Sequence, residues 1–255
     1  MASYLITGAG RGLGLELATQ LAGLPTTQVS IVFAAIRSST PPSALQALIE
    51  KSKGRVVAVT SMVITDRTSL DKAVAQVEAQ LNGKGLDVLI NNAGALPPAF
   101  DGIAKMDNLR YAFEVNVEAV HDVTSAFLPL LKKGTAKKVV NISTTLGSID
   151  HAPKYKWAPF PAYKISKAAL NMLTVQWAQE YAEEGFTVFA VSPGWLKTDL
   201  GTENADLDVS VGAQATLHVI GNSTTEDNGT FRNILVPGWE NKEGPNQYDG
   251  KIVPW

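Results

Sequence analysis

Tyr163 and Lys167 are the residues whose types and spacing most directly suggest catalysis. They lie four positions apart in the segment AYKISK (162–167), where a stretch with helical spacing begins. Residues four apart on a helix share one face. A free tyrosine ionises near pH 10, and a neighbouring ammonium lowers that pKa by stabilising the phenolate. The pair is therefore interpreted either as a proton donor beside a charge that tunes it, or as a polar pair on a solvent-facing helix.

Short apolar segments alternate along the chain with segments of helical periodicity. The predicted strands cover 3–8, 29–36, 55–64, 86–94, 137–143 and 186–194. The predicted helices cover 13–23, 43–52, 69–82, 104–133 and 162–184. This alternation predicts an α/β fold, a Rossmann-type doubly wound parallel sheet with helices on both faces. No repeat or linker interrupts it, so we expect a single domain over 1–255, with a nucleotide at the carboxyl ends of the strands.

A glycine-rich turn, TGAGRGLG (7–14), follows the first predicted strand and opens the first helix. Glycines let the backbone turn tightly and approach a pyrophosphate, while the N-terminus of the helix attracts the anion. The alternative is a turn with a purely structural role. The candidate cofactor-binding residues in it are Gly8, Gly10, Arg11, Gly12, Leu13 and Gly14.

The end of the second predicted strand indicates which nucleotide would bind. An NAD site needs a carboxylate there for the ribose 2′-hydroxyl, whereas NADP needs a cation for the 2′-phosphate. The segment AAIRSS places Arg37 and Ser38 at this point without a carboxylate, and Arg11 adds a second cation. These charges favour NADP(H), with two solvated arginines as the alternative.

The composition favours a small-molecule partner. The 255 residues include 22 Lys and Arg against 24 Asp and Glu, a net charge of -2, without a basic stripe for nucleic acid or an anionic membrane. There are no cysteines and only three histidines, so neither a catalytic thiol nor a metal site is expected. The first residues, MASYLITGAG, do not have the pattern of a signal peptide, so a cytoplasmic location is expected.

Five ordered motifs make the sequence resemble the short-chain dehydrogenase/reductase family over almost the whole chain. They are the glycine turn, NNAG (91–94) with Asn116, NIST (141–144), Tyr163 with Lys167, and PGWLKTD (193–199). Within the family, Arg11 and Arg37 resemble the basic pair of NADP-dependent carbonyl reductases. The segments LGSI (146–149), PGWLKTDLG and YDGKIVPW (248–255) look like sniffer-type carbonyl reductases and fungal toxin-pathway ketoreductases of the norsolorinic acid ketoreductase type.

The resemblance implies the catalytic roles. Tyr163 would donate a proton to the carbonyl oxygen, Lys167 would lower its pKa and bind the nicotinamide ribose, and Asn116 would hold a water for proton resupply. The serine usual in this family aligns with Thr144, and Ser143 is its neighbour. Successive residues of an extended strand point to opposite sides, so only one of the two hydroxyls can serve. We expect Thr144, with Ser143 as the alternative.

The resemblance also implies further cofactor contacts. Asn92, Ala93 and Gly94 would lie beside the adenosine ribose. Leu196 would reach the carboxamide through its backbone, and Thr198 the phosphates or the carboxamide. The sequence departs from the family after the third strand, where Val63 stands in place of the first of two acidic residues. The second acidic residue is present as Asp66. Adenine would therefore be held by apolar packing and by the Ile64 backbone. The implied contacts from the two loops are Ile64, Asp66, Pro193, Gly194, Leu196 and Thr198.

Substrate loops are expected near 95–103, 148–162 and 195–210. Their aromatic and apolar side chains suit a bulky, flat carbonyl compound, although each could instead belong to the core. The candidate substrate residues are Leu96, Tyr155, Trp157 and Trp195. The predicted function is NADPH-dependent reduction of a bulky, aromatic or polyketide-like ketone to a secondary alcohol in secondary metabolism.

Other functions remain open at this point. A catalytically silent NADP(H)-binding sensor or scaffold would keep the fold without turnover. An epimerase or dehydratase is less favoured, because little chain follows residue 199 to build a larger substrate domain. The helices predicted at 104–133 and 162–184 could pair in a homo-oligomer or face solvent.

Overall fold

The computed structural model describes residues 1–255, which divide into two compact units. The first unit contains Met1–Ala93 and Ala119–Val140. The second contains Gly94–Glu118 and Asn141–Trp255. That the whole chain acts as one domain stays a prediction.

The first unit is built on four buried strands. They are β1 (Ala2–Thr7), β2 (Val29–Ala35), β3 (Val56–Val59) and β4 (Val88–Asn91), in the order β3-β2-β1-β4. Every neighbouring pair among them is parallel, and Leu5 faces Phe33 on one side and Leu89 on the other. These three side chains are fully buried, as expected for strands covered on both faces.

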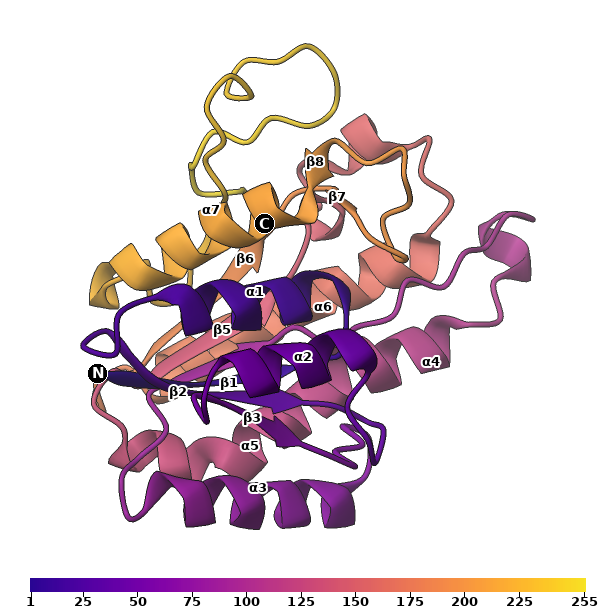
Figure 1. The fold of residues 1–255 in the computed structure, drawn as a ribbon. Coiled ribbons are helices and arrows are strands. Elements are labelled where there is room, and N and C mark those ends of the chain that lie inside the picture. The colour runs from indigo at the N-terminus through magenta and orange to yellow at the C-terminus, as the bar shows by residue number, and fades with distance from the viewer. The chain divides into compact units, whose positions relative to one another are not determined.

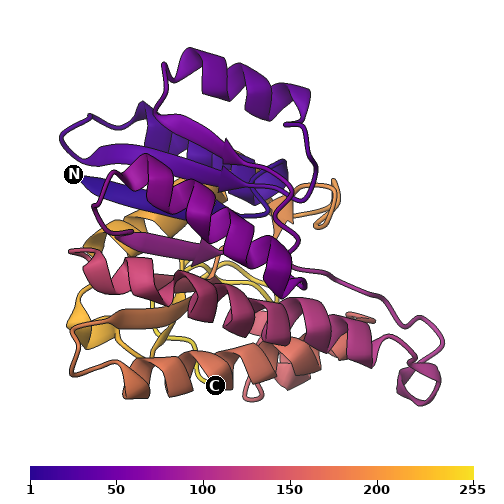
Figure 2. The ribbon, with the colours of Figure 1, turned by 90° about the horizontal axis from the view of Figure 1, so that it is seen from below.

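Helices cover both faces of these strands. The helices are α1 (Gly12–Gly23), α2 (Ser43–Lys51), α3 (Arg67–Leu81) and α5 (Ala119–Lys133). Figure 1 shows α1 on one face and α3 with α5 on the other, and Figure 2 shows α3 and α5 side by side. Ion pairs Arg67–Asp122 and Lys133–Glu78 join α3 to α5. Exposed pairs contribute at most about 1 kcal/mol each, so the buried apolar faces supply most of the packing energy.

The second unit carries the remaining helices and sheet strands. They are α4 (Leu109–Phe113), the π-helix η2 (Glu114–Glu118), α6 (Pro161–Glu180), β6 (Thr187–Ser192), α7 (Val209–Asn222) and β9 (Phe231–Asn233). Helices α6 and α7 pack on β6, which pairs in parallel with β9. The strand β5 (Lys138–Ile142) begins in the first unit and ends in the second. The full order β3-β2-β1-β4-β5-β6-β9 confirms the predicted doubly wound class.

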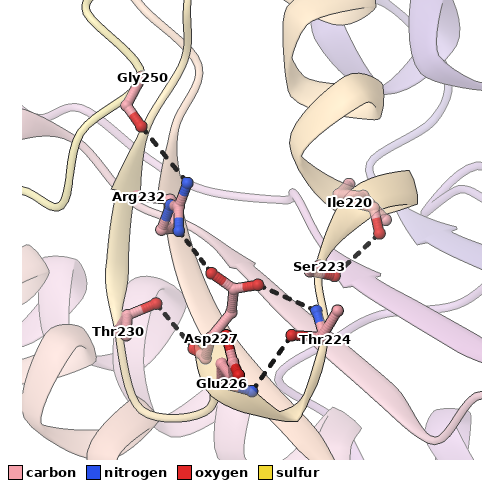
Figure 3. Close-up of polar contacts among 8 residues, drawn as sticks. All are labelled: Ile220, Ser223, Thr224, Glu226, Asp227, Thr230, Arg232 and Gly250. Carbon is pink, nitrogen blue, oxygen red and sulfur yellow. Dashed lines mark hydrogen bonds and ion pairs between the residues drawn. The ribbon is translucent and has the colours of Figure 1, made fainter.

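A polar cluster fastens the end of the chain to β9 (Figure 3). Thr224 and Asp227 form a reciprocal capping box around the short helix η5 (Thr225–Asp227). Asp227 also accepts a hydrogen bond from Arg232 Nη1, and Arg232 Nη2 donates to the Gly250 carbonyl. The neighbouring Asn233 Nδ2 donates to the Gln247 carbonyl at 2.7 Å. These two bonds hold the C-terminal side of the loop formed by residues 237–250 to β9.

Several element boundaries differ from the sequence predictions. The helix predicted over 104–133 begins at Leu109, because residues 103–105 form a separate 3-10 turn after Gly102, whose φ is +87°. The predicted 55–64 and 86–94 strands are shorter, and the 162–184 helix ends at Glu180. Helix α7 and the three-residue strand β9 were not predicted. None of the helices combines the length and apolar character needed to cross a membrane.

Candidate active site

Tyr163 and Lys167 lie in the first two turns of α6, which begins with Pro161 at its first position. Proline there suits a helix start, because its fixed φ is helical and its missing N–H would have no partner. Tyr163 is half-buried, whereas Lys167 is only 5% exposed. Lys167 Nζ lies 5.7 Å from the centre of the Tyr163 ring and donates to the Ile142 carbonyl at 2.7 Å. Helix α6 therefore places the ammonium beside the phenol, as predicted.

Burial perturbs the pKa of both groups. It raises the pKa of Tyr163 and lowers the pKa of Lys167 to about 8, because each loses stabilisation of its charged form. Desolvation sets the direction of the Tyr163 pKa shift in the protein alone, and the lowering of this pKa by Lys167 stays a prediction. At neutral pH the phenol thus keeps its proton, as a proton donor must.

The two hydroxyls at the end of β5 have different surroundings. Ser143 is 2% exposed, and its Oγ donates a 2.6 Å hydrogen bond to Asn171 Oδ1. Thr144 is half-buried, and its Oγ1 accepts a 3.3 Å hydrogen bond from the Leu146 backbone as the cap of η3 (Thr145–Gly147). The hydroxyl proton of Ser143 is thus committed to Asn171, while that of Thr144 remains available. This geometry favours Thr144 as the hydroxyl that meets a substrate.

Asn116 lies inside the π-helix η2 and is completely buried. Its Oδ1 accepts from the Ala95 amide and its Nδ2 donates to the Ala95 carbonyl, both at 2.9 Å. The same Nδ2 donates to Ser166 Oγ at 3.0 Å. The side chain thus joins the Ala95 loop to α6, and the water that Asn116 would hold stays a prediction.

Three residues that were not predicted from the sequence support this arrangement. Ser166 Oγ donates to the Tyr163 carbonyl at 2.8 Å and accepts from Asn116. A Cβ on Gly147 would lie 2.7 Å from Lys167 Cβ, so only glycine lets η3 approach α6 this closely. Asn171 binds Ser143 and follows Lys167 by four residues. That four-residue repeat along α6 was the signal that could have identified it.

The glycine turn has the backbone expected of an anion cradle. Gly8 and Gly12 have φ values of +68° and +54°, which other residues rarely adopt. A Cβ on Gly14 would lie 2.5 Å from the Gly8 carbonyl oxygen. Thr7 Oγ1 accepts from the amides of Asn92 and Ala93, both at 3.0 Å. Within the first unit, Thr7 thus joins the turn to Asn92 and Ala93, and the turn fits a pyrophosphate.

Charge at the end of β2 fits a phosphate group. Arg37 is exposed and has no ion-pair partner, and Ser38 Oγ donates to the Thr40 carbonyl at 2.7 Å. Arg11 is exposed at the N-cap position of α1. Asp66 caps α3 by accepting from the Thr68 amide at 3.0 Å, and Ile64 is half-buried. The acid at 66 therefore has a structural function besides any contact with adenine.

The PGWLKTD segment forms a tight loop in the second unit. Pro193 is buried, and Gly194 has a φ of +88°. Leu196 lies in β7 (Leu196–Lys197), which pairs in parallel with β8 (Leu207–Asp208). Thr198 Oγ1 accepts from the Gly201 amide at 3.1 Å and lies 3.4 Å from the Leu196 carbonyl, to which it donates. Thr198 already stabilises this loop in the protein alone.

The predicted substrate residues have different environments. Trp157 is 56% exposed, and its ring centre lies 6.1 Å from that of Trp195. Leu96 is half-buried. Tyr155 is only 2% exposed, and its hydroxyl donates to Thr145 Oγ1 at 2.8 Å, so its ring belongs to the core instead of an open wall. Trp157 and Trp195 therefore form an aromatic pair, of which Trp157 is accessible to solvent.

Comparison with known proteins decides the family. Residues 3–207 match the family described as short chain dehydrogenase. The chain belongs to the short-chain dehydrogenase family. RED3, a short-chain dehydrogenase of Pyricularia oryzae, is 31% identical over 265 residues, which cover 99% of this chain and 98% of that protein. AacuF of Aspergillus aculeatus, a short-chain dehydrogenase/reductase, is 37% identical over 204 residues, covering 76% and 74%.

Solved structures of short-chain dehydrogenases agree with this fold. The NADPH-bound carbonyl reductase from chicken fatty liver has a TM-score of 0.84 and 32% identity, covering 100% of this chain and 99% of its own. Carbonyl reductase Sniffer of D. melanogaster has a TM-score of 0.85 and 29% identity, covering all of both chains. The predicted family is confirmed, and this short-chain dehydrogenase is an oxidoreductase.

Proposed function

We propose that the protein uses NADPH to reduce a bulky, aromatic or polyketide-like ketone to a secondary alcohol, as part of secondary metabolism. The observation that carries the proposal is the position of the buried ammonium of Lys167, 5.7 Å from the centre of the Tyr163 ring on the same face of α6. The bound NADPH of the chicken carbonyl reductase, which matches this chain end to end, supports the choice of cofactor. The secondary-metabolism role rests on the sequence resemblance to fungal ketoreductases.

The residues of the first unit are suited to the phosphate groups of NADP(H). The amides of the glycine turn and the N-terminus of α1 would receive the pyrophosphate. Arg37 would pair with the 2′-phosphate, because its guanidinium is exposed and has no carboxylate partner. When bound, NADPH supplies the hydride.

The residues of the second unit are suited to polarise and protonate a carbonyl. Thr144 Oγ1 donates a hydrogen bond to the carbonyl oxygen, and Tyr163 Oη donates the proton. The ammonium of Lys167, 5.7 Å from the phenol ring, then stabilises the resulting phenolate. Asn116 and Ser166 fix the part of α6 that carries both groups.

Loss of NADPH absorbance with a panel of one-ring and fused-ring aromatic ketones tests this function. We expect turnover of at least the larger ketones and a strong preference for NADPH over NADH. Tight NADPH binding with no turnover across the panel would contradict the proposal and favour a sensor. A panel reduced equally well with NADH would contradict the assignment of Arg37.

A further inference from the structure

A cavity of about 150 Å³ lies in the second unit beside the loop 237–250, drawn in yellow in Figure 1. The rings of Trp195 and Trp239 line it, together with Asp206 and residues 242–246. A volume of about 150 Å³ accommodates about one benzene-sized ring, and the lining combines the two tryptophans with the polar side chains of Asp206, Lys242, Glu243 and Asn246. The cavity therefore suits one ring of a larger molecule rather than a whole polycyclic ligand.

The walls of this cavity are held by neighbouring side chains. Lys242 Nζ lies 3.3 Å from the centre of the Trp239 ring, and the Tyr248 ring centre lies 5.1 Å from it. Trp195 Nε1 donates to the Gly201 carbonyl at 2.7 Å. Together with the hydrogen bonds from Arg232 and Asn233 at the base of the loop, these contacts form the aromatic walls before any ligand arrives. A preformed wall lowers the entropy cost of binding.

Asp206 supplies a directional polar group at the cavity. Its Oδ2 accepts from Asn246 Nδ2 at 2.7 Å and from the Tyr248 hydroxyl at 2.6 Å. Its Oδ1 has no hydrogen-bond partner in the protein, and the residue is half-buried. A carboxylate oxygen in this state is an acceptor for a ligand hydroxyl.

The cavity is connected to the segments that carry the catalytic residues. The Tyr155 hydroxyl lies 3.1 Å from Asn246 Oδ1 and 2.8 Å from Thr145 Oγ1, next to Thr144 in the chain. Lys164, next to Tyr163, donates through Nζ to the Tyr155 carbonyl at 2.6 Å. Asn246, which lines the cavity, is therefore linked through Tyr155 to the segments that carry Thr144 and Tyr163.

We propose that this cavity is a substrate subsite for a phenolic ring, which packs against Trp195 and Trp239 while its hydroxyl donates to Asp206 Oδ1. The assignment rests on the proposed ketone reduction and narrows its substrate to hydroxylated, fused-ring aromatic ketones. Aromatic packing supplies most of the affinity, and the hydrogen bond to the carboxylate selects the phenol over its methyl ether.

Calorimetric binding of 2-naphthol to the full chain with saturating NADP⁺ tests the subsite without requiring turnover. Trp239→Ala should weaken 2-naphthol binding about tenfold, the loss expected for one aromatic contact. Trp177→Ala, the same change in an α6 residue that stacks on Tyr181 outside the cavity, should leave it within about twofold. The wild type should also bind 2-naphthol about tenfold more tightly than 2-methoxynaphthalene, which cannot donate to Asp206.

Unchanged 2-naphthol affinity in Trp239→Ala, or no binding to the wild type, overturns the subsite. Equal affinities for the naphthol and its methyl ether overturn the assignment of Asp206. If 2-naphthol binds as expected but no ketone of the panel is reduced, the proposed function is contradicted and the subsite is not. In contrast, reduction of the ketones with unaltered 2-naphthol binding in Trp239→Ala contradicts the subsite alone.

Discussion

Replacing Thr144 by alanine should remove the hydroxyl that polarises the substrate carbonyl. Its Oγ1 has only a 3.3 Å bond from the Leu146 amide, so the fold loses little. Loss of one donor to a developing oxyanion costs about 3 kcal/mol, which corresponds to about a hundredfold in kcat. Thr144→Ser keeps the donor and should retain kcat within about threefold. Ketone-dependent NADPH oxidation under saturating conditions measures both variants.

Ser143→Ala is the matched control, because it removes the neighbouring hydroxyl. It leaves Asn171 Oδ1 without its 2.6 Å donor, so the free energy of unfolding in urea should fall by about 1–3 kcal/mol. The kcat should stay within about threefold of the wild type. A hundredfold loss of kcat in folded Ser143→Ala with near-normal Thr144→Ala would refute the assignment of Thr144.

Three further predictions follow from the same structure. A Cβ on Gly14 would lie 2.5 Å from the Gly8 carbonyl oxygen, so Gly14→Ala should abolish NADPH binding, which fluorescence titration measures. Gly23→Ala is the control and should retain NADPH binding, because the space around its Cβ is open. Arg37→Glu should raise the KM for NADPH by about 10- to 100-fold and leave the KM for NADH nearly unchanged. Equal changes in the two KM values would contradict the pairing of Arg37 with the 2′-phosphate. Because the pKa of Lys167 falls to about 8 on folding, the unfolded state binds more protons between pH 8 and 10.5, and stability rises with pH there. Between pH 7.5 and pH 9.5 the free energy of unfolding of the wild type, measured in urea, should rise by about 2 kcal/mol relative to that of Lys167→Met. A difference between the two proteins that does not change with pH would contradict the lowered pKa of Lys167.

The strand pattern and the ordered motifs predict the fold class and the family correctly. Buried parallel strands read as apolar runs, and the glycine turn has a fixed position after the first of them. Strand β9 could not be found this way, since its three residues, Phe231–Asn233, are too few for a periodic signal. Helix α7 was missed because Gly212 and several β-branched residues weaken its helical signal.

The candidate site shows the same division between local and tertiary information. Spacing along one helix places Tyr163 beside Lys167, and motif alignment selects Thr144 over Ser143. The direction of the Tyr163 pKa shift could not be predicted, because desolvation depends on neighbours brought together by folding. Likewise, the burial of Tyr155 and the contacts of Asn116 with Ala95 and Ser166 could not be predicted, because they depend on the tertiary structure.

Tyr163→Phe isolates the role of the phenol hydroxyl, because it removes one oxygen and preserves the ring beside Lys167. We expect an unchanged dissociation constant for NADPH and a loss of at least about a hundredfold in kcat for ketone reduction. The two values come from fluorescence titration and from NADPH oxidation on the same folded sample. Full kcat in Tyr163→Phe would contradict Tyr163 as the proton donor and, with it, the proposed mechanism.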